Sequence, residues 1–572
     1  MRFVSTILSL GLLLFVCQSP QDVIRRHYES AEAQRLAGNL VAAESEYTAI
    51  LAEAYERLGE VFLAGEDYKR ALTVLEPAVR YRPNSPSVQI DLAIAYFGVG
   101  QYDKALESSR KALVFEPNNA GAHQMLGKTY FMLGDLAKSI GELETAARLA
   151  PKDIDVTYTL GIAYLRNRQT ADAKQLYNAM IEQFGDQPQL HVIIGRAYRQ
   201  SGLLPEATEQ FKRAIALDPR FPRAHYYLGI SYLLDEGQKK IGEAAEEFKI
   251  EMAANPDEFF ANYYLGVVYV YQRKWDLAIT FLLRASTIEP NNPDPYFQLG
   301  QAYQELNRHE QAVEVLKKAI AFNPDLAHNK NQVTTAHHRL AQSLLKLGQT
   351  EAGQKELQIA SDLKAQAFKL EQQVPKVAPG MGTGKLGRVE PNSPEIGFGQ
   401  PAISGTRPDA KTSQELKGGA DYYQKILATA HNNVGLLRAE LQDFRVAAEQ
   451  FAMAVKWNPE QEGLDYNLGL AYYKSQMYDR AIPPLENELK IRPENRPARL
   501  LLGMSRYDLG KALLQRGDTK GAIDNLERAA KLDPEKPDFH LQLGQAYISA
   551  GRKAEGNSEI EISRQLQRKT PN

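Results

Sequence analysis

The chain has 572 residues, and its apolar content of 44% is typical of a folded protein rather than a disordered one. Lys and Arg number 68 and Asp and Glu number 70, so the near-zero net charge gives no electrostatic drive toward nucleic acid or an anionic membrane surface. The single cysteine, Cys17, excludes an intrachain disulfide and a cysteine-based metal site.

Residues 1–19 have the pattern of a signal peptide or an N-terminal anchor. Arg2 precedes an apolar run over residues 4–16, which is short for a bilayer span, and the pattern predicts export to the periplasm or cell envelope. Cys17 follows Leu-Phe-Val as in a lipoprotein lipobox, although Val16 stands where that motif has Gly, Ala or Ser. Lipid attachment at Cys17, with outer-membrane association, is therefore an alternative. We expect no further membrane span, because no other apolar stretch approaches ~18 residues.

A repeat then runs along the chain with a period of 34 residues. Proline follows an apolar–polar pair at Pro83, Pro117 and Pro151, and later at Pro219. Gly185 occupies the intervening place. The next prolines are Pro256, Pro290 and Pro324, and the one longer interval of 37 residues indicates an insertion of three residues near Asp235–Lys240.

Each repeat reads as two helices and a turn. Between residues 86 and 119, Leu92 and Tyr96 share one face of a first helix, and Gly100 begins a turn. Ala105 and Ala112 share one face of a second helix, and Pro117 ends the repeat because proline cannot continue a helix. Small residues at the facing positions, Ala93 and Ala105, predict close helix approach, which a bulkier residue would prevent.

The pattern Leu-Gly/Ala-x-x-Tyr, then Ala, an aromatic residue or Leu, Ala and Pro, resembles the tetratricopeptide repeat (TPR) family. The resemblance implies an all-α solenoid, a right-handed TPR superhelix whose first helices line the concave side. About fourteen repeats begin near residues 24, 52, 86, 120, 154, 188, 222, 259, 293, 334, 428, 462, 503 and 537. The first has only about 28 residues and lacks its proline, and those near 334 and 503 follow seven extra residues, which would lengthen a helix by two turns.

We expect two arrays of repeats. The first covers residues 24–374 with about ten repeats and ends in one long helix over Glu351–Val374. A Gly/Pro-rich linker over residues 375–420 is expected to be flexible and mostly unstructured. The second array covers residues 421–570 with about four repeats.

The motifs of enzymes and metal sites do not occur in a usable context. Residues 382–387 read Gly-x-Gly-x-x-Gly, but no strand precedes them, and Leu386 follows Lys385 where a P-loop needs Ser or Thr. His337 and His338 are adjacent, so they diverge by about 100° on a helix and cannot chelate one metal alone. A surface or packing role is therefore favoured for both histidines. We therefore predict a non-catalytic protein without a cofactor or a metal.

A partner is expected to bind on the concave side. In the TPR family the fifth, ninth and twelfth residues of a repeat face the groove, which implies a largely apolar strip. The candidate groove residues are Ile94, Phe97, Phe131, Tyr158, Ile162, Leu165, Arg196, Arg199, Tyr226, Ile230, Leu233, Tyr263 and Val267, with Ile90, Gln124, Lys128, Val192 and Val270 at the remaining positions. The ninth-position Asn of carboxylate-clamp repeats is absent, which favours an extended peptide or an amphipathic helix as the partner.

Alternatives remain at these positions. A tight superhelix would instead pack the same side chains on adjacent repeats, and Arg196 and Arg199 could either steer an acidic group or face solvent. The resulting prediction is an exported, non-catalytic scaffold that binds one or more proteins. The alternative is a structural adaptor of a polysaccharide or pilus export and assembly machine, whose aromatic groove residues could also stack on glycan. An accessory arm of a glycosyltransferase is not favoured, because no catalytic domain remains outside the arrays.

Overall fold

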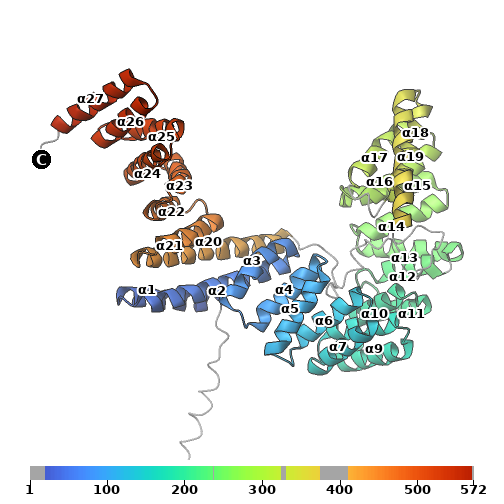
Figure 1. The fold of residues 1–572 in the computed structure, drawn as a ribbon. Helices are drawn as coiled ribbons and strands as arrows, with labels where there is room; N and C mark the ends of the chain where they lie inside the picture. The colour runs from blue at the N-terminus through green and yellow to red at the C-terminus, as the bar shows by residue number, and fades with distance from the viewer. Residues whose placement is uncertain (1–19, 236, 324–329, 374–409, 570–572) are drawn as a thin grey trace, which may run out of the picture. The chain divides into compact units, whose positions relative to one another are not determined.

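The computed structural model describes residues 20–235, 237–323, 330–373 and 410–569 (Figure 1). These residues form 27 α-helices and one 3-10 helix, and no strand occurs among them. The predicted all-α solenoid fold is confirmed, because successive helices pair and stack along the chain. The predicted signal segment, Cys17 and most of the predicted linker lie outside the described residues.

The helices group into two compact parts. We call residues 1–125 and 406–572 the discontinuous part and residues 126–405 the continuous part. The discontinuous part contains α1 (Pro20–Leu36), α2 (Leu40–Ala64), α3 (Tyr68–Tyr81), α4 (Pro86–Gly98), α5 (Tyr102–Phe115), α20 (Ala410–Glu440), α21 (Phe444–Trp457), α22 (Leu464–Lys474), α23 (Tyr478–Ile491), α24 (Arg496–Gln515), α25 (Thr519–Leu532), α26 (Pro537–Ser549) and α27 (Lys553–Lys569).

The boundary between the two parts lies inside α6 (Ala120–Met132), and the continuous part begins at residue 126. It contains α7 (Leu136–Leu149), α8 (Ile154–Arg166), α9 (Thr170–Phe184), α10 (Pro188–Gln200), α11 (Leu204–Leu217), α12 (Ala224–Asp235), η1 (Gly237–Lys240), α13 (Ile241–Ala254), α14 (Phe259–Tyr271), α15 (Trp275–Ile288), α16 (Pro293–Glu305), α17 (His309–Ala321), α18 (Lys330–Lys346) and α19 (Thr350–Gln373). The expected long terminal helix and the three-residue insertion appear as α19 and η1.

The two helices of a repeat touch at a glycine. A Cβ on the first-helix glycine would overlap a large side chain sixteen residues later, as with Gly195 and Phe211, where the separation would be 2.6 Å. The same relation holds for Gly59 with Leu75, Gly127 with Leu143, Gly161 with Tyr177, Gly266 with Leu282, Gly300 with Leu316, Gly435 with Phe451, Gly469 with Leu485, Gly510 with Leu526 and Gly544 with Ile560. In the repeat near residue 86, Ala93 replaces glycine and the residue sixteen later is the small Ser109, so the contact volume is preserved.

Besides the terminal α19, the helices α2, α24 and α20 are much longer than a standard repeat provides. The 25 residues of α2 join the second helix of the first repeat to the first helix of the next, since no proline separates them. The 20 residues of α24 exceed the 13 of α26, which confirms the expected lengthening near residue 503. The 31-residue α20 begins at Ala410, so the predicted linker boundary at residue 420 is wrong.

α20 packs on α2. Leu427, Val434 and Leu437 of α20 share one buried apolar cluster with Tyr55 and Leu58 of α2. Ala420 is buried in the same cluster and Leu416 lies near Gly65 at the end of α2, whereas most of residues 411–418 are exposed. The helices that follow residue 410 therefore belong with α1–α5 in one compact part, although some 280 residues of sequence lie between them.

We expect Gly195→Ala to destabilise the protein by about 1–3 kcal/mol, because the added methyl group overlaps Phe211 inside a closely packed helix pair. Urea unfolding followed by far-ultraviolet circular dichroism measures the change. Gly141→Ala in α7 is the matched control, because nothing lies within 4 Å of a Cβ at that position. Since alanine favours helix over glycine, this control should gain about 0.5–1 kcal/mol. Equal effects of the two substitutions would contradict the proposed role of the close contact.

Candidate functional site

The predicted groove residues fall on the first helices of consecutive repeats, as expected, but they differ in exposure. Ile94 and Phe97 lie on α4 in the discontinuous part, and the others lie on α6, α8, α10, α12 and α14 in the continuous part. Half-buried positions are Ile94, Phe97, Phe131, Arg196, Tyr263 and Val267. Buried positions are Tyr158, Ile162, Leu165, Arg199, Tyr226, Ile230 and Leu233.

Stacking between neighbouring repeats accounts for the burial of Tyr226. Its ring stacks on Phe260 of the next repeat, with centroids 5.5 Å apart, and also lies 6.0 Å from the ring of Tyr264. Only 2% of Tyr226 is exposed, so at this position the alternative of tight packing on an adjacent repeat describes the structure. Tyr226 is a poor target for testing a binding surface, since its substitution would open the core.

The two arginines of α10 share one aromatic ring. The guanidinium carbons of Arg196 and Arg199 lie 5.7 and 5.6 Å from the ring centroid of Tyr227, in cation–π geometry. The Nε atom of Arg196 is buried and has no hydrogen-bond acceptor among the described residues. The positive charge is therefore held against the face of an aromatic ring, and the steering of an acidic group stays a prediction.

A pocket of about 450 Å³ opens among α12, α14 and α16. Its apolar wall includes four predicted groove residues, Ile230, Leu233, Tyr263 and Val267. The wall also contains Leu234, Tyr264, Val270 and Tyr271, and Arg273 and Trp275 extend it beyond α14. The pocket thus collects predicted residues from two adjacent repeats.

The residues that α16 contributes to the pocket are polar, namely Gln298, Gln301 and Glu305. Gln301 is the ninth residue of the repeat that begins near 293, so the groove register extended by one repeat would have identified it. Gln298 and Glu305 are the sixth and thirteenth residues of that repeat, and the register does not select them. The complete pocket therefore combines apolar anchoring surface with two side-chain amides and a carboxylate.

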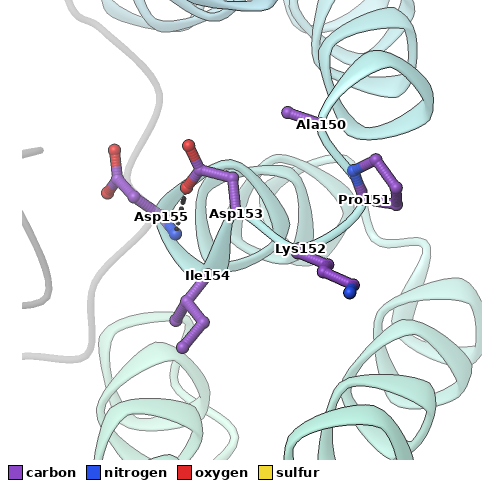
Figure 2. Close-up of a pocket in the computed structure, with 6 residues that line it drawn as sticks. All are labelled: Ala150, Pro151, Lys152, Asp153, Ile154 and Asp155. Atoms are coloured by element: carbon purple, nitrogen blue, oxygen red, sulfur yellow. Dashed lines mark hydrogen bonds between the residues drawn. The ribbon is translucent and has the colours of Figure 1, made fainter. Parts of the chain in front are cut away.

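A second hollow, of about 610 Å³, lies beside the turn between α7 and α8 (Figure 2). The described residues that line it are six consecutive ones, residues 150–155. The Asp153 carboxylate at this turn accepts hydrogen bonds from the backbone nitrogens of Asp155, at 2.9 Å, and Val156, at 3.2 Å. Asp153 therefore caps the start of α8, and its polar group is committed to the fold.

One carboxylate cluster has ligand-like spacing. Oxygen atoms of Glu56, Glu60 and Asp91 lie within 4.8 Å of one another. Arg82 pairs with Glu56 and Arg57 pairs with Glu60, which supplies compensating positive charge. Burial, together with the charges of Glu60 and Glu56, raises the pKa of Asp91 to about 7. Glu56 and Glu60 of α2 are therefore engaged in ion pairs, and Asp91 of α4 lies beside them.

Histidines show a regularity that the sequence analysis missed. Seven of the ten occupy the fourth position of a repeat, namely His27, His123, His191, His225, His337, His431 and His540. In most of these the ring bonds to a side chain on the second helix of the same repeat, as in His337 with Glu356 at 2.6 Å. His337 therefore has a packing role, as predicted, and its periodic place in the repeat was the signal that could have revealed it.

Models of one repeat family match several stretches of the chain. A family model described as TPR repeat matches residues 195–235, 266–307 and 510–551. Models described as tetratricopeptide repeat match residues 62–108 and 134–197, residues 90–154 and 435–497, and residues 293–326. Together the matches cover more than half of the chain.

Similar proteins share only parts of their length with this chain. The BBSome complex member BBS4 homolog of Drosophila melanogaster is 23% identical over 247 residues, which cover 42% of this chain and 41% of the relative. BBSome complex member BBS4 of Bos taurus is 27% identical over 107 residues, or 19% of each chain. Each alignment thus spans less than half of the curated relative.

Two solved structures also align with short stretches of the chain. The structure of MamA protein is 22% identical, with a TM-score of 0.29, and covers 33% of this chain and 98% of its own. The structure of YrrB, whose title describes a TPR protein with an unusual peptide-binding site, is 23% identical with a TM-score of 0.24 and covers 33% and 95%.

No helix within the described ranges is both long and apolar enough to cross a membrane. The described chain is instead a series of paired helices with a small residue at each point of contact and repeat-family matches from residue 62 to residue 551. On these grounds the chain belongs to the tetratricopeptide repeat family, whose fold serves as a scaffold for interactions between proteins.

Proposed function

We propose that this chain is a non-catalytic scaffold that binds a peptide segment or helix of a partner protein in the pocket among α12, α14 and α16. The pocket itself is the observation that carries the proposal. Its volume of about 450 Å³ falls within the usual range of roughly 300–1,000 Å³ for ligand sites. Its lining residues come from successive first helices, so a segment that binds there contacts more than one repeat.

The chemistry of the apolar and polar lining residues supports a peptide ligand. Tyr263, Trp275 and Val267 offer the large apolar contact area that anchors bulky side chains at protein interfaces. Gln298 and Gln301 carry amides that both donate and accept hydrogen bonds, as a peptide backbone requires. A partner segment with one or two bulky apolar side chains beside a polar strip fits this lining.

One comparison is consistent with a scaffold. The curated relatives are named as members of a complex, the BBSome, and a role within an assembly agrees with a protein that binds other proteins.

Tyr263 and Trp275 could also stack on a sugar ring. That observation favours the second candidate, a structural adaptor of a polysaccharide or pilus export and assembly machine that contacts glycan.

We expect Val267→Arg to weaken peptide binding at least tenfold, because it places a long charged side chain on the apolar wall. Peptides selected from a displayed random library serve as probes, and isothermal titration measures their Kd. Thr287→Arg is the matched control, since it adds the same side chain to an exposed position of α15, outside the pocket. If Val267→Arg folds and binds every selected peptide as tightly as the control, the pocket is not the binding site. Selective binding of soluble oligosaccharides, lost in Val267→Arg, would favour the glycan-contacting adaptor.

We further propose that the protein acts in the periplasm or the cell envelope, on the basis of the signal-like residues 1–19. Deletion of residues 2–19 should leave the protein in the cytoplasm of a bacterial host, whereas the full chain should appear in the envelope fraction. Labelling with palmitate tests lipid attachment, and Cys17→Ser should abolish the label if Cys17 carries the lipid. Equal distribution of the full and shortened chains between the fractions would contradict export.

A further inference from the structure

The contact between α2 and α20 joins parts of the sequence that are far apart, and we call it the seam. Figure 1 shows α20 running beside α2. The seam contains the apolar side chains of Leu427, Val434 and Leu437 from α20, packed with Tyr55 and Leu58 from α2. At one end Arg438 of α20 pairs with Glu44 of α2 at 2.7 Å. Apolar burial therefore supplies most of the cohesion, and a polar group inside the seam must find its partners there.

A chain of hydrogen bonds crosses the seam. The indole nitrogen of Trp457 donates to the Tyr55 hydroxyl at 3.1 Å. That hydroxyl in turn donates to Nε2 of His431 at 2.9 Å, and Nδ1 of His431 donates to the amide oxygen Oε1 of Gln450 at 2.7 Å. These roles require the neutral imidazole with its proton on Nδ1, because a carbonyl oxygen only accepts and the indole nitrogen only donates.

His431 differs from the other histidines of its position. A carboxylate oxygen lies 2.5–2.6 Å from one ring nitrogen in each of the pairs His27–Glu46, His191–Asp186, His225–Glu247, His337–Glu356 and His540–Glu559. At His431 the second-helix residue nineteen positions later is the neutral Gln450, as Gln210 is at His191. The other ring nitrogen of His191 meets the carboxylate of Asp186, whereas that of His431 meets the neutral Tyr55 hydroxyl. The ring of His431 thus has neutral partners at both nitrogens.

The charged groups around His431 pair with one another and do not compensate a positive charge on its ring. On α2, Tyr55 faces the ring, while Glu53 and Glu60 pair with Arg57 near Tyr423. The neighbouring α3 contributes Arg80 and the ring of Tyr81, which stacks on Tyr55 at 5.6 Å. Near the end of α20, Glu44 pairs with Arg438, and Glu440 pairs with Arg35 of α1. Asp443 also pairs with Arg438. Burial lowers the pKa of His431 from its ordinary value of 6.5 to about 4.

We propose that the seam is a proton-sensitive docking surface, on which protonation of His431 weakens the attachment of α20 and the helices after it to α1–α3. A proton on Nε2 removes the acceptor of the Tyr55 hydroxyl and adds a positive charge to a buried ring in edge-to-face contact with the ring of Tyr55. The partner that docks here is the chain's own segment from residue 410 onward. The observation stands apart from the pocket in the continuous part and from any partner bound there.

The sign and size of the effect follow from linkage. The pKa of His431 is lower in the docked state than in the open state, so docking is strongest above pH 6.5 and weakens as the pH falls toward 4. With these two values, docking at pH 5 should be about 30-fold weaker than at pH 7.5. At His225, by contrast, the hydrogen bond with Glu247 raises the pKa of the ring, so its protonation is favoured.

Hydrogen–deuterium exchange on the full chain tests the proposal. After correction for the intrinsic exchange rate, we expect the opening equilibrium of α2 and α20 to rise about 30-fold between pH 7.5 and pH 5. Gln450→Glu introduces a second-helix carboxylate like those beside His27, His225, His337 and His540, and it should reduce this rise to less than threefold. His540→Gln is the matched control at the same repeat position of another repeat, and it should leave the rise at the seam unchanged.

Fluorescence gives an independent measurement, because the chain has only two tryptophans and Trp457 belongs to the hydrogen-bond chain. In a Trp275→Phe background, emission from Trp457 should shift to longer wavelength as the pH falls from 7.5 to 5. This shift should disappear in Gln450→Glu. The proposal is overturned if exchange at the seam does not change with pH, or if Gln450→Glu responds to pH as the unsubstituted chain does.

Discussion

The close contact between a small first-helix residue and a large second-helix side chain sixteen residues later determines how near the helices of each repeat can lie. Stability in such a fold is approximately a sum over neighbouring helices, so each contact also fixes the surface offered to the next repeat. Gly195 with Phe211 and Ala93 with Ser109 solve the same volume problem in opposite ways. The pocket among α12, α14 and α16 depends on this spacing, because its walls are successive first helices.

Much of the fold could be predicted because it is written in local periodicity. The prolines, the Leu-Gly/Ala-x-x-Tyr pattern and the insertion near residue 237 each affect residues within one repeat, and the helices α12, η1 and α13 follow that pattern. The seam could not be predicted in this way. Tyr55 and His431 meet across 376 positions of sequence, and nothing in the helical period of α20 identifies α2 as its neighbour. The early start of α20 could not be predicted either, because residues 410–419 have low apolar content and most of them are exposed.

The candidate site was predictable in outline and not in detail. Register within the repeat identifies which residues face the concave side, and Ile230, Tyr263 and Val267 do line the pocket. Register does not say how closely adjacent first helices approach, so it could not separate Tyr263, which is half-buried, from Tyr226, which lies under Phe260. Exposure depends on the bulk of residues one repeat away, and that information is absent from the repeat pattern itself.

The seam gives α2 a different position from every other helix in the discontinuous part. One of its faces packs on α3 in the ordinary stacking of repeats, and another packs on α20, which begins a second stack. A change in α2 therefore acts on two series of helices at once, whereas a change in a helix within either series acts mainly on its two neighbours. His431 lies at this junction, and its hydrogen bonds need the neutral ring, so its protonation affects the packing of both series of helices. The neutral Gln450 places that sensitivity in the repeat whose histidine bonds to Tyr55 of α2.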